Sequence, residues 1–471
     1  MATVIRSETH PEVASFGDVN RDLMRMMGKP GKGYFILLGI TIAGVIMMFT
    51  TWGYQMATGF GLTGMNNPVG WGSYITTFVF WVGIGHAGTL ISAVLFLFRA
   101  RWRQSIYRAS EAMTVFAVLT AGLFPLIHVG RPWLAYYLVP YPNQRGIWPN
   151  FRSPLVWDVF AVSTYLTVSA TFFLLGMIPD IAAARDMTTV PWRKKLYTML
   201  AFGWRGTERE WRHYSKAYLY LAALATPLVL SVHSVVSWDF AMSIVPGWHT
   251  TIFAPYFVAG AIFSGLAMVI TIVVPIRKIF GLEAYFTERH FNAMALLVLA
   301  ASSIVFYAYL TEFFIAWYSF ERPERAIFWD RVTGQYWWAV WIMLTCNGII
   351  PMLLWSPKIR RNIGALFTIT IFVNIGMWFE RFVIIVTSLA HEYEPWQWRT
   401  YSPSVTEMMI VFGSFCWFGM WFLLFIRVLP AVSIAELKEV LPPPLRFARK
   451  GQPISGVAES HGRIGRPEVK E

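Results

Sequence analysis

Ten long apolar stretches constrain the fold of this 471-residue chain more than any other feature of its sequence. At about 20 residues or more, each stretch is long enough to cross the hydrocarbon core of a bilayer as a helix. A membrane β-barrel would instead show short segments of alternating polarity. The sequence therefore predicts an all-α integral membrane protein with ten transmembrane helices. The predicted spans are 34–57, 73–98, 111–130, 154–178, 215–238, 252–276, 291–318, 336–356, 362–389 and 405–429.

The distribution of basic residues predicts how these helices are oriented. Of the 39 Lys and Arg residues, 31 lie in the two terminal segments and in alternate loops, whereas 7 lie in the other loops. Because cytoplasmic segments of membrane proteins are enriched in Lys and Arg, both termini are predicted to be cytoplasmic. Topology thereby explains the formal net charge of +13, which argues against a nucleic-acid partner.

The composition is also that of a membrane protein, with 56% hydrophobic and 14% charged residues. The N-terminal segment mixes acidic and basic residues and lacks the apolar core and cleavage site of a secretory signal peptide. We therefore expect the first span to start membrane insertion. The two cysteines, Cys346 and Cys416, lie within spans and form no metal-binding motif. We expect no iron–sulfur cluster in this chain.

The spans are predicted to group into two four-helix bundles. Spans two to five would form the first bundle, spans six to nine would form the second, and spans one and ten would flank them. A polar N-terminal segment and a C-terminal tail would both be cytoplasmic. The predicted segments are thus 1–33, 34–57, 73–238, 252–389, 405–429 and 430–471.

Three polar segments carry predictions of their own. The 179–214 loop alternates aromatic and basic residues, which is typical of an amphipathic segment on the inner membrane face. The outer loop 132–152 is rich in Trp, Tyr and Pro and is expected at the outer interface. The tail from Pro442 onwards, with three successive prolines and many charges, is expected to be extended or disordered until a partner orders it.

Titratable residues gather at the outer ends of the third, fourth and fifth spans. The third span ends at His128, the fourth begins with Asp158 about one turn inside, and the fifth ends at Asp239. Within a membrane such residues are costly and usually functional. A histidine and a partly buried carboxylate suit the two-electron, two-proton oxidation of a lipid-borne hydroquinone, because each phenolic oxygen needs a proton acceptor. We predict His128 and Asp158 as the acceptor pair and Asp239 as a proton relay.

Structural alternatives exist for each of these residues. His128 could be an interfacial residue, and Asp158 could serve only as an anion at a helix N-terminus. His233 and His249 are further candidates for binding the hydroquinone. His233 lies six residues before Asp239, so the two would point to different faces of a continuous helix. A structural role is therefore the favoured interpretation for His233.

Five other titratable residues are candidates for a proton path. His86, in the middle of span two, either bonds a neighbouring helix or belongs to such a path, and Glu111 either feeds it or is a solvated helix-end anion. The second bundle contributes Glu312, Glu380 and Arg381. Adjacent helical residues point about 100° apart, so Glu380 and Arg381 are each expected to pair with a residue on another helix.

Three motifs resemble those of the NrfD, or polysulfide-reductase, membrane subunits. They lie at 85–92 (GHAGTLIS), 128–133 (HVGRPW) and 153–158 (SPLVWD). Within that family, the ten spans and the cytoplasmic tail most resemble the ActC subunits of bacterial alternative complex III. His128 and Asp158 match the family's quinol-site His and Asp, and Asp239 is a looser match. Arg131, in the same motif as His128, is a further candidate for binding the quinol.

The resemblance implies a quinol:electron-acceptor oxidoreductase in a bacterial inner membrane that takes electrons from menaquinol at its outer face. It implies an iron–sulfur subunit with [3Fe–4S] and [4Fe–4S] clusters, a subunit that is a multihaem cytochrome c, a homologous NrfD-like subunit and small membrane subunits as partners. A terminal oxidase is a further candidate partner. The resemblance leaves open whether protons cross the membrane during the reaction.

Two functions from other classes fit the sequence less well. A haem b-type electron carrier needs pairs of axial histidines on facing helices, yet His86, His128 and His233 are expected at unlike depths. A transporter with inverted repeats would have interrupted helices at corresponding positions. The intramembrane prolines at 125, 227 and 275 do not correspond in this way.

Overall fold

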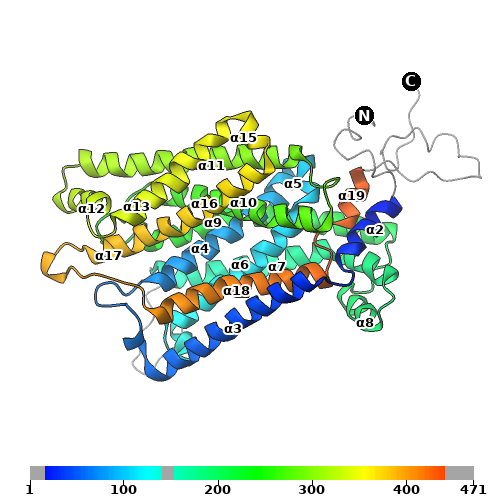
Figure 1. Ribbon diagram of the computed structural model, residues 1–471, viewed down its shortest axis with the longest axis horizontal. Coiled ribbons are helices and arrows are strands. Elements are labelled where there is room, and N and C mark those ends of the chain that lie inside the picture. Colours follow the sequence, from blue (N-terminus) through cyan, green and yellow to red (C-terminus); the bar gives the residue numbers. More distant parts are fainter. Residues whose placement is uncertain (1–15, 140–152, 441–471) are drawn as a thin grey trace, which may run out of the picture.

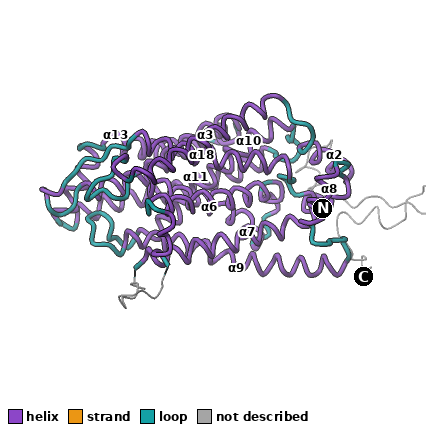
Figure 2. The backbone as a smooth tube through the Cα atoms, turned by 90° about the horizontal axis from the view of Figure 1, so that it is seen from below, coloured by secondary structure: helices purple, strands orange, loops and turns teal. Residues whose placement is uncertain are grey.

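The computed structural model describes residues 16–139 and 153–440, and the elements in these two ranges are helices without any strand (Figures 1 and 2). Within these two ranges, ten helices are long and apolar enough to cross a membrane. The predicted all-α class with ten spans is confirmed, and the chain is a multi-pass integral membrane protein. The spans are α3 (Lys32–Thr58), α4 to α5 (Ser73–Leu97), α6 (Tyr107–His128), α7 (Pro154–Met187), α9 (Glu208–Ala241), α10 (Phe253–Phe280), α11 (Glu288–Tyr318), α13 to η6 (Trp337–Trp355), α16 to α17 (Ile363–Ala390) and α18 (Val405–Val428).

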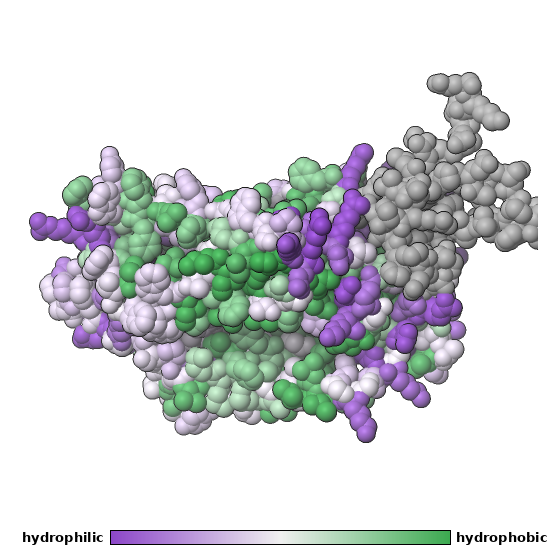
Figure 3. All heavy atoms as spheres, turned by 45° about the horizontal axis from the view of Figure 1, so that its top comes forward, coloured by the Kyte–Doolittle hydropathy of each residue, from purple (hydrophilic) through white to green (hydrophobic). Residues whose placement is uncertain are grey.

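The surface has the polarity of a membrane-embedded protein. In Figure 3 hydrophobic side chains cover the middle of the visible face, and hydrophilic side chains gather towards both ends. Large apolar residues are exposed along the spans, including Phe35 and Ile36 on α3 and Tyr307 and Phe314 on α11. Such exposure would be unfavourable in water, whereas a bilayer solvates it.

Helix α4 lies at the centre of the molecule. It packs against α6, α10, α16 and α18, and nearly all of its side chains are buried. Small residues permit this close approach, since a Cβ atom at Gly88 would overlap Thr114 and one at Gly265 would approach Ala87. Helices in a membrane associate through such close contacts because lipid tails supply no hydrophobic driving force between them.

Helices α3 and α18 pack against each other, and α18 also contacts α6 and α4. At their crossing, Gly44 of α3 faces Cys416 of α18, and Gly413 of α18 faces Met48 of α3. The predicted first bundle touches the predicted second bundle mainly where α10 meets α4 and α9. The division into two bundles remains a prediction.

Three short helices lie at one end of the molecule, called here the inner end: α2 (Phe16–Met26), α8 (Pro191–Leu200) and α19 (Ile434–Val440) (Figure 1). Helix α19 is held by the ion pair between Arg103 and Glu436, whose atoms lie 3.0 Å apart. The predicted amphipathic segment 179–214 is shorter than expected, because α7 continues to Met187 and α9 begins at Glu208. A capping box at Thr207 and Glu210 fixes that second boundary.

The opposite end, called the outer end, carries η4 (Pro132–Leu138) and α12 (Arg322–Thr333). The predictions for residues 140–152 of the outer loop and for the tail from Pro442 onwards lie outside the described residues. So does the start of the N-terminal segment, residues 1–15.

Candidate functional site

A cavity of about 450 Å³ opens among α4, α6, α7, α9 and η4 towards the outer end. Its walls are mostly apolar, with side chains such as Ile75, Phe78 and Leu126. Three titratable residues also line it: His128, Asp158 and Asp239. These are the three that sequence reasoning placed in the reaction, and they come from three consecutive spans.

Helix ends bring His128 and Asp158 to the cavity. His128 is the last residue of α6, and its ring centroid lies 6.4 Å from that of Phe60. Asp158 is the fifth residue of α7, which begins with a proline after Ser153. Proline suits the first helical position because its missing N–H would have no partner there. Asp158 therefore lies just beyond the first turn of α7, where the helix holds it against the cavity.

Gly130 allows the chain to turn after His128. Its φ is +78°, and a Cβ at this position would overlap the ring of Phe60. We predict that Gly130→Ala lowers stability by about 1–2 kcal/mol for the left-handed backbone alone, with a further loss from the overlap. Thermal unfolding of the purified protein would measure this. Gly122→Ala is the control, because a Cβ at Gly122 meets no atom within 4 Å.

The carboxyl groups of Asp158 and Asp239 lie beside each other, close enough to share a hydrogen bond when one is protonated. Asp158 is only 7% exposed. Among the described residues, the Oδ1 atoms of both aspartates and Nδ1 of His128 are buried without a hydrogen-bond partner. Buried polar atoms are usually paired. The cavity therefore presents three groups that are free to bond a polar ligand.

Three other predicted residues do not line this cavity. Arg131 is exposed just before η4. His249 is also exposed, with Nδ1 lying 3.6 Å from a carboxylate oxygen of Glu324. His233 is fully buried deeper in the protein, where its ring meets that of His86 at a centroid distance of 4.5 Å.

The contact between His86 and His233 corrects the expectation that these residues lie at unlike depths. Helix α9 extends three residues beyond the predicted end of its span, so His233 lies two turns below its outer end and level with His86. The two rings touch edge to face at an interplanar angle of 62°. Axial ligands of a haem face each other across the iron, and rings in direct contact leave no room for the macrocycle between them.

Polar groups continue from this histidine pair towards the inner end. The ring of His86 stacks on that of Tyr165 at 5.0 Å, and the Tyr165 hydroxyl lies 2.8 Å from Oγ1 of Thr89. Thr89 in turn lines a cavity of about 10 Å³, close to the size of one water molecule. Glu111 lines the same cavity. These groups form a polar column from mid-membrane to the inner half of α6.

Glu111 is not a solvated helix-end anion, which is one of the two roles that the sequence predicts for it. It is 3% exposed, and Oε2 lies 3.0 Å from Nη1 of Arg108. Arg108, with no exposed surface, also pairs with Asp180 of α7 at 3.0 Å and donates to the carbonyl of Gly176 at 2.6 Å. The helix begins at Tyr107, four residues before the predicted start of the span, so Glu111 lies one turn inside rather than at the end.

Glu380 and Arg381 pair with each other, so the expectation of separate partners on other helices is wrong for this ion pair. Nη1 of Arg381 lies 3.1 Å from Oε1 of Glu380. The Cβ directions differ by about 100°, but the long Arg side chain folds back across that angle. Other helices still contribute, because Tyr309 of α11 donates to Glu380 and Asn347 donates to Tyr309 at 3.0 Å.

Arg381 lies close to the contact between the two predicted bundles, which Phe257 makes with His233. Its guanidinium lies 4.2 Å above the ring centroid of Phe257 on α10, and that ring lies 5.7 Å from His233.

Closer to the outer end, Glu312 is 8% exposed and lies near Arg331 of α12. Arg331 donates to Thr387 at 3.0 Å and to Ser388 at 2.8 Å.

Sequence reasoning missed Tyr309, Asn347, Tyr165 and Arg108. π-helical turns lie beside three groups of polar residues, those around Thr89, Asn347 and Arg381. These turns are η2 (Leu90–Val94), η5 (Thr345–Ile349) and η7 (Val383–Thr387), respectively. Such turns occur frequently at functional sites. They rotate the following residues out of the ordinary helical register, and the amino-acid composition does not indicate where they occur. Within the described residues, no three His, Cys, Asp or Glu side chains are grouped to hold a metal ion.

Comparison with known proteins identifies the family of this chain. The model of the family described as polysulphide reductase, NrfD, matches residues 61–391. The chain belongs to this family. A Halobacterium salinarum protein, provisionally assigned as a membrane subunit of a dimethyl sulfoxide reductase, is 26% identical over 78% of this chain and 79% of its own length. The predicted resemblance to NrfD proteins is thereby confirmed.

Two further relatives of this NrfD protein are membrane subunits whose names refer to menaquinol or menaquinone. The Hdr-like menaquinol oxidoreductase integral membrane subunit of Archaeoglobus fulgidus is 19% identical, over 87% of this chain and 96% of its own length. The menaquinone reductase integral membrane subunit of Nitratidesulfovibrio vulgaris is 21% identical, over 77% of this chain and 84% of its own length.

Proposed function

We propose that this NrfD protein is the quinol-binding membrane subunit of a quinol:electron-acceptor oxidoreductase of the alternative complex III type, and that it oxidises menaquinol in the outer cavity. The observation that carries the proposal is the convergence of His128, Asp158 and Asp239 on one apolar cavity, each with a buried atom free to bond. Relatives named for menaquinol or menaquinone support the choice of substrate.

Oxidation of a hydroquinone releases two protons and two electrons and leaves the quinone. In our proposal His128 accepts one phenolic proton at Nδ1, and Asp158 accepts the other at Oδ1. Asp239, beside Asp158, takes up that second proton and passes it towards the outer surface. Proton acceptors positioned in this way typically contribute about 10²–10⁴-fold to a rate. The apolar wall holds the ring and excludes water.

The two electrons must leave through a partner, because we propose no redox cofactor in this chain. An iron–sulfur subunit at the outer face would accept them one at a time and pass them to a c-type cytochrome. The cavity supports this arrangement, since it lies near the outer end of α6, α7 and α9. With both termini in the cytoplasm of a bacterium, the outer end would be periplasmic.

We further propose that the polar column carries protons between the cytoplasm and mid-membrane. In the predicted first bundle the column would run from Glu111 to His86. Glu312, Glu380 and Arg381 would extend it into the predicted second bundle. The contacts from Thr89 through Tyr165 to the His86–His233 pair, and the small cavity that Thr89 shares with Glu111, support this. From His233 to Asp239 the path must cross six residues of α9, which is about 9 Å of helix.

The variant His128→Gln tests the proposed site. Glutamine keeps a hydrogen-bonding side chain but cannot take up a proton, so we expect menaquinol oxidation to fall by about 10²-fold or more. Turnover of the purified complex with reduced menaquinone and a soluble electron acceptor measures this.

The matched control is His249→Gln, since His249 is exposed outside the cavity. It should retain the wild-type rate. Wild-type turnover of an assembled His128→Gln complex would refute the assignment of His128 as a proton acceptor.

A further inference from the structure

We propose that a second cavity, between α4, α10, α16 and α18, binds the hydroquinone head of another lipid-borne quinol through the side chain of Asn374. The cavity has a volume of about 460 Å³, within the range of roughly 300–1,000 Å³ that is usual for small-molecule sites. This inference rests on the proposed function for the chemical class of the ligand. The position of the site, in contrast, comes from the cavity alone.

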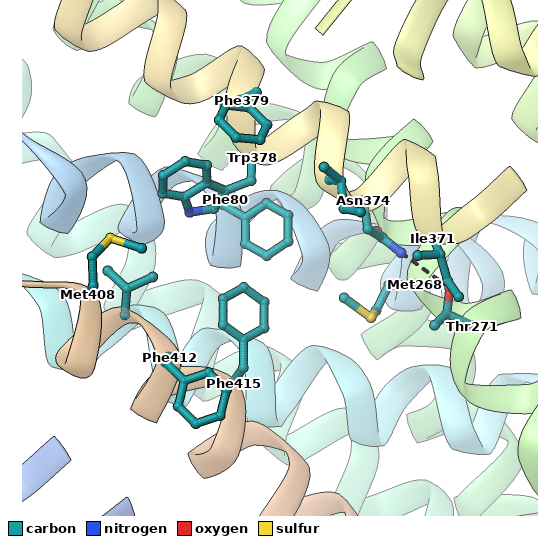
Figure 4. Close-up of a pocket in the computed structure, with 12 residues that line it drawn as sticks. Phe80, Met268, Thr271, Ile371, Asn374, Trp378, Phe379, Met408, Phe412 and Phe415 are labelled. Carbon is teal, nitrogen blue, oxygen red and sulfur yellow. Dashed lines mark hydrogen bonds between the residues drawn. The ribbon is translucent and has the colours of Figure 1, made fainter. Parts of the chain in front are cut away.

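Aromatic rings dominate the wall of this cavity. Figure 4 shows Phe80 of α4, Trp378 and Phe379 of α16 and Phe412 and Phe415 of α18 around one space. A flat conjugated ring can stack against such side chains, with favourable offset or edge-to-face contacts. A saturated acyl chain gains no comparable benefit from aromatic walls.

A single amide supplies the polar contact, and its orientation is determined by its neighbours. The hydroxyl of Thr271 donates to the carbonyl of Ala267 at 2.8 Å, and its Oγ1 also lies 3.1 Å from Oγ1 of Thr370. Thr271 can therefore only accept from Asn374, whose Nδ2 lies 3.2 Å away (Figure 4). This directs Nδ2 of Asn374 towards Thr271 and leaves Oδ1 as an acceptor without a donor among the described residues.

Oδ1 of Asn374 is buried without a hydrogen-bond partner among the described residues. A buried acceptor without a donor is unfavourable. A hydroquinone has two O–H donors, whereas the oxidised quinone has only acceptors. The site should therefore prefer the reduced form of the ligand.

The length of the cavity argues against a transmembrane helix of a partner as the occupant. On α18 the lining residues run from Met408 to Phe415, about 12 Å of helix, whereas the whole of α18 has 24 residues and extends about 36 Å. A helix that crosses the membrane would need a groove along the full span. A ring followed by part of an isoprenoid tail fits the shorter space.

The second cavity is separate from the first. Ile75, Phe78 and Val79 of α4 line the outer cavity, while Phe80 lines the second. At 3.6 residues per turn, Phe80 points to a different side of α4 from those three residues. Trp378 also ties α16 to α4 by donating to Oγ1 of Thr77 at 3.2 Å. A quinol at Asn374 would thus lie on a different side of α4 from the outer cavity.

Photolabelling of the intact complex in lipid nanodiscs tests the proposal. The probe is a prenylated naphthohydroquinone that carries a diazirine, and mass spectrometry of peptides locates the label. We expect label on residues 371–379 or 408–415 with the reduced probe, and at least about threefold less with the oxidised probe, as the loss of one hydrogen bond implies. Unlabelled naphthohydroquinone should displace the probe, and added phosphatidylglycerol should not.

Two variants complete the test. Asn374→Leu removes the acceptor, and Phe412→Leu removes one partly exposed ring. Each should weaken labelling of 371–379 and 408–415 about three- to tenfold while labelling around His128 is unchanged. The second site would be refuted by unlabelled α16 and α18, by equal displacement with phosphatidylglycerol, or by a partner peptide cross-linked there. Label at the second site without any label near His128 would instead refute the proposed reaction site and leave this one standing.

Discussion

Replacing Asp158 with Asn is expected to slow menaquinol oxidation by about 10²–10⁴-fold, the contribution of a positioned proton acceptor. Asparagine has nearly the same shape, so the start of α7 and the wall of the cavity should persist. The amide, however, cannot take a proton, and it would place an N–H₂ donor or a neutral oxygen beside Asp239. The variant therefore removes the acid–base function and leaves the packing. Steady-state oxidation of reduced menaquinone by the assembled complex measures the loss.

The same change at Asp330 is the control for Asp158→Asn. Asp330 lies on α12 at the outer end, where it pairs with His391 at 3.3 Å and does not line the cavity. Asp330→Asn should keep the wild-type rate. If Asp158→Asn also kept that rate in a complex of normal composition, Asp158 could not be the proton acceptor. Loss of the complex from the membrane would show instead that Asp158 is needed for assembly, and that result would contradict the prediction.

Much of the fold could be predicted from the sequence because bilayer thickness and backbone hydrogen bonding leave few choices. A chain in hydrocarbon must pair its own N–H and C=O groups, so an apolar stretch of sufficient length becomes a helix. The outer site followed by the same argument. His128, Asp158 and Asp239 lie within one or two turns of helix ends, where depth can be judged from sequence spacing alone.

Side-chain contacts deeper in the membrane could not be predicted from the sequence. The contact of His86 with His233 depends on which face of α9 meets α4, and sequence spacing does not determine the rotation of one helix against another. The Glu380–Arg381 pair depends on how the long side chain of Arg381 folds back. Contacts with Phe257 and Tyr309 on other helices determine this arrangement. Neutral tyrosines such as Tyr165 carry no charge signal, although they connect the ionisable groups.

The buried Arg108 cluster lies at the inner end of α6, and it leads to the largest expected effect on stability. Arg108 is completely buried and lies 3.0 Å from both Glu111 and Asp180. Replacing it with Met would remove the guanidinium that contacts both buried carboxylates. Breaking a buried ion pair in this way costs about 3–5 kcal/mol. We expect Arg108→Met to lower the unfolding midpoint strongly, as followed by size-exclusion chromatography of heated, detergent-solubilised protein.

The control for Arg108→Met is Arg212→Met, because Arg212 pairs with Glu208 on the exposed start of α9. An exposed pair contributes little to stability, so the unfolding midpoint should hardly change.

A triple variant, Arg108→Met with Glu111→Leu and Asp180→Leu, separates the charge from the packing. Apolar side chains of similar volume often replace a buried ion cluster without loss of stability, so the triple variant should be more stable than Arg108→Met alone. It should nevertheless lose any proton transfer that begins at Glu111, measured as acidification of the medium by proteoliposomes during quinol oxidation. If the single and triple variants were equally unstable, packing around Arg108 rather than its charge would hold the inner end together. If the triple variant still moved protons, the column would not begin at Glu111.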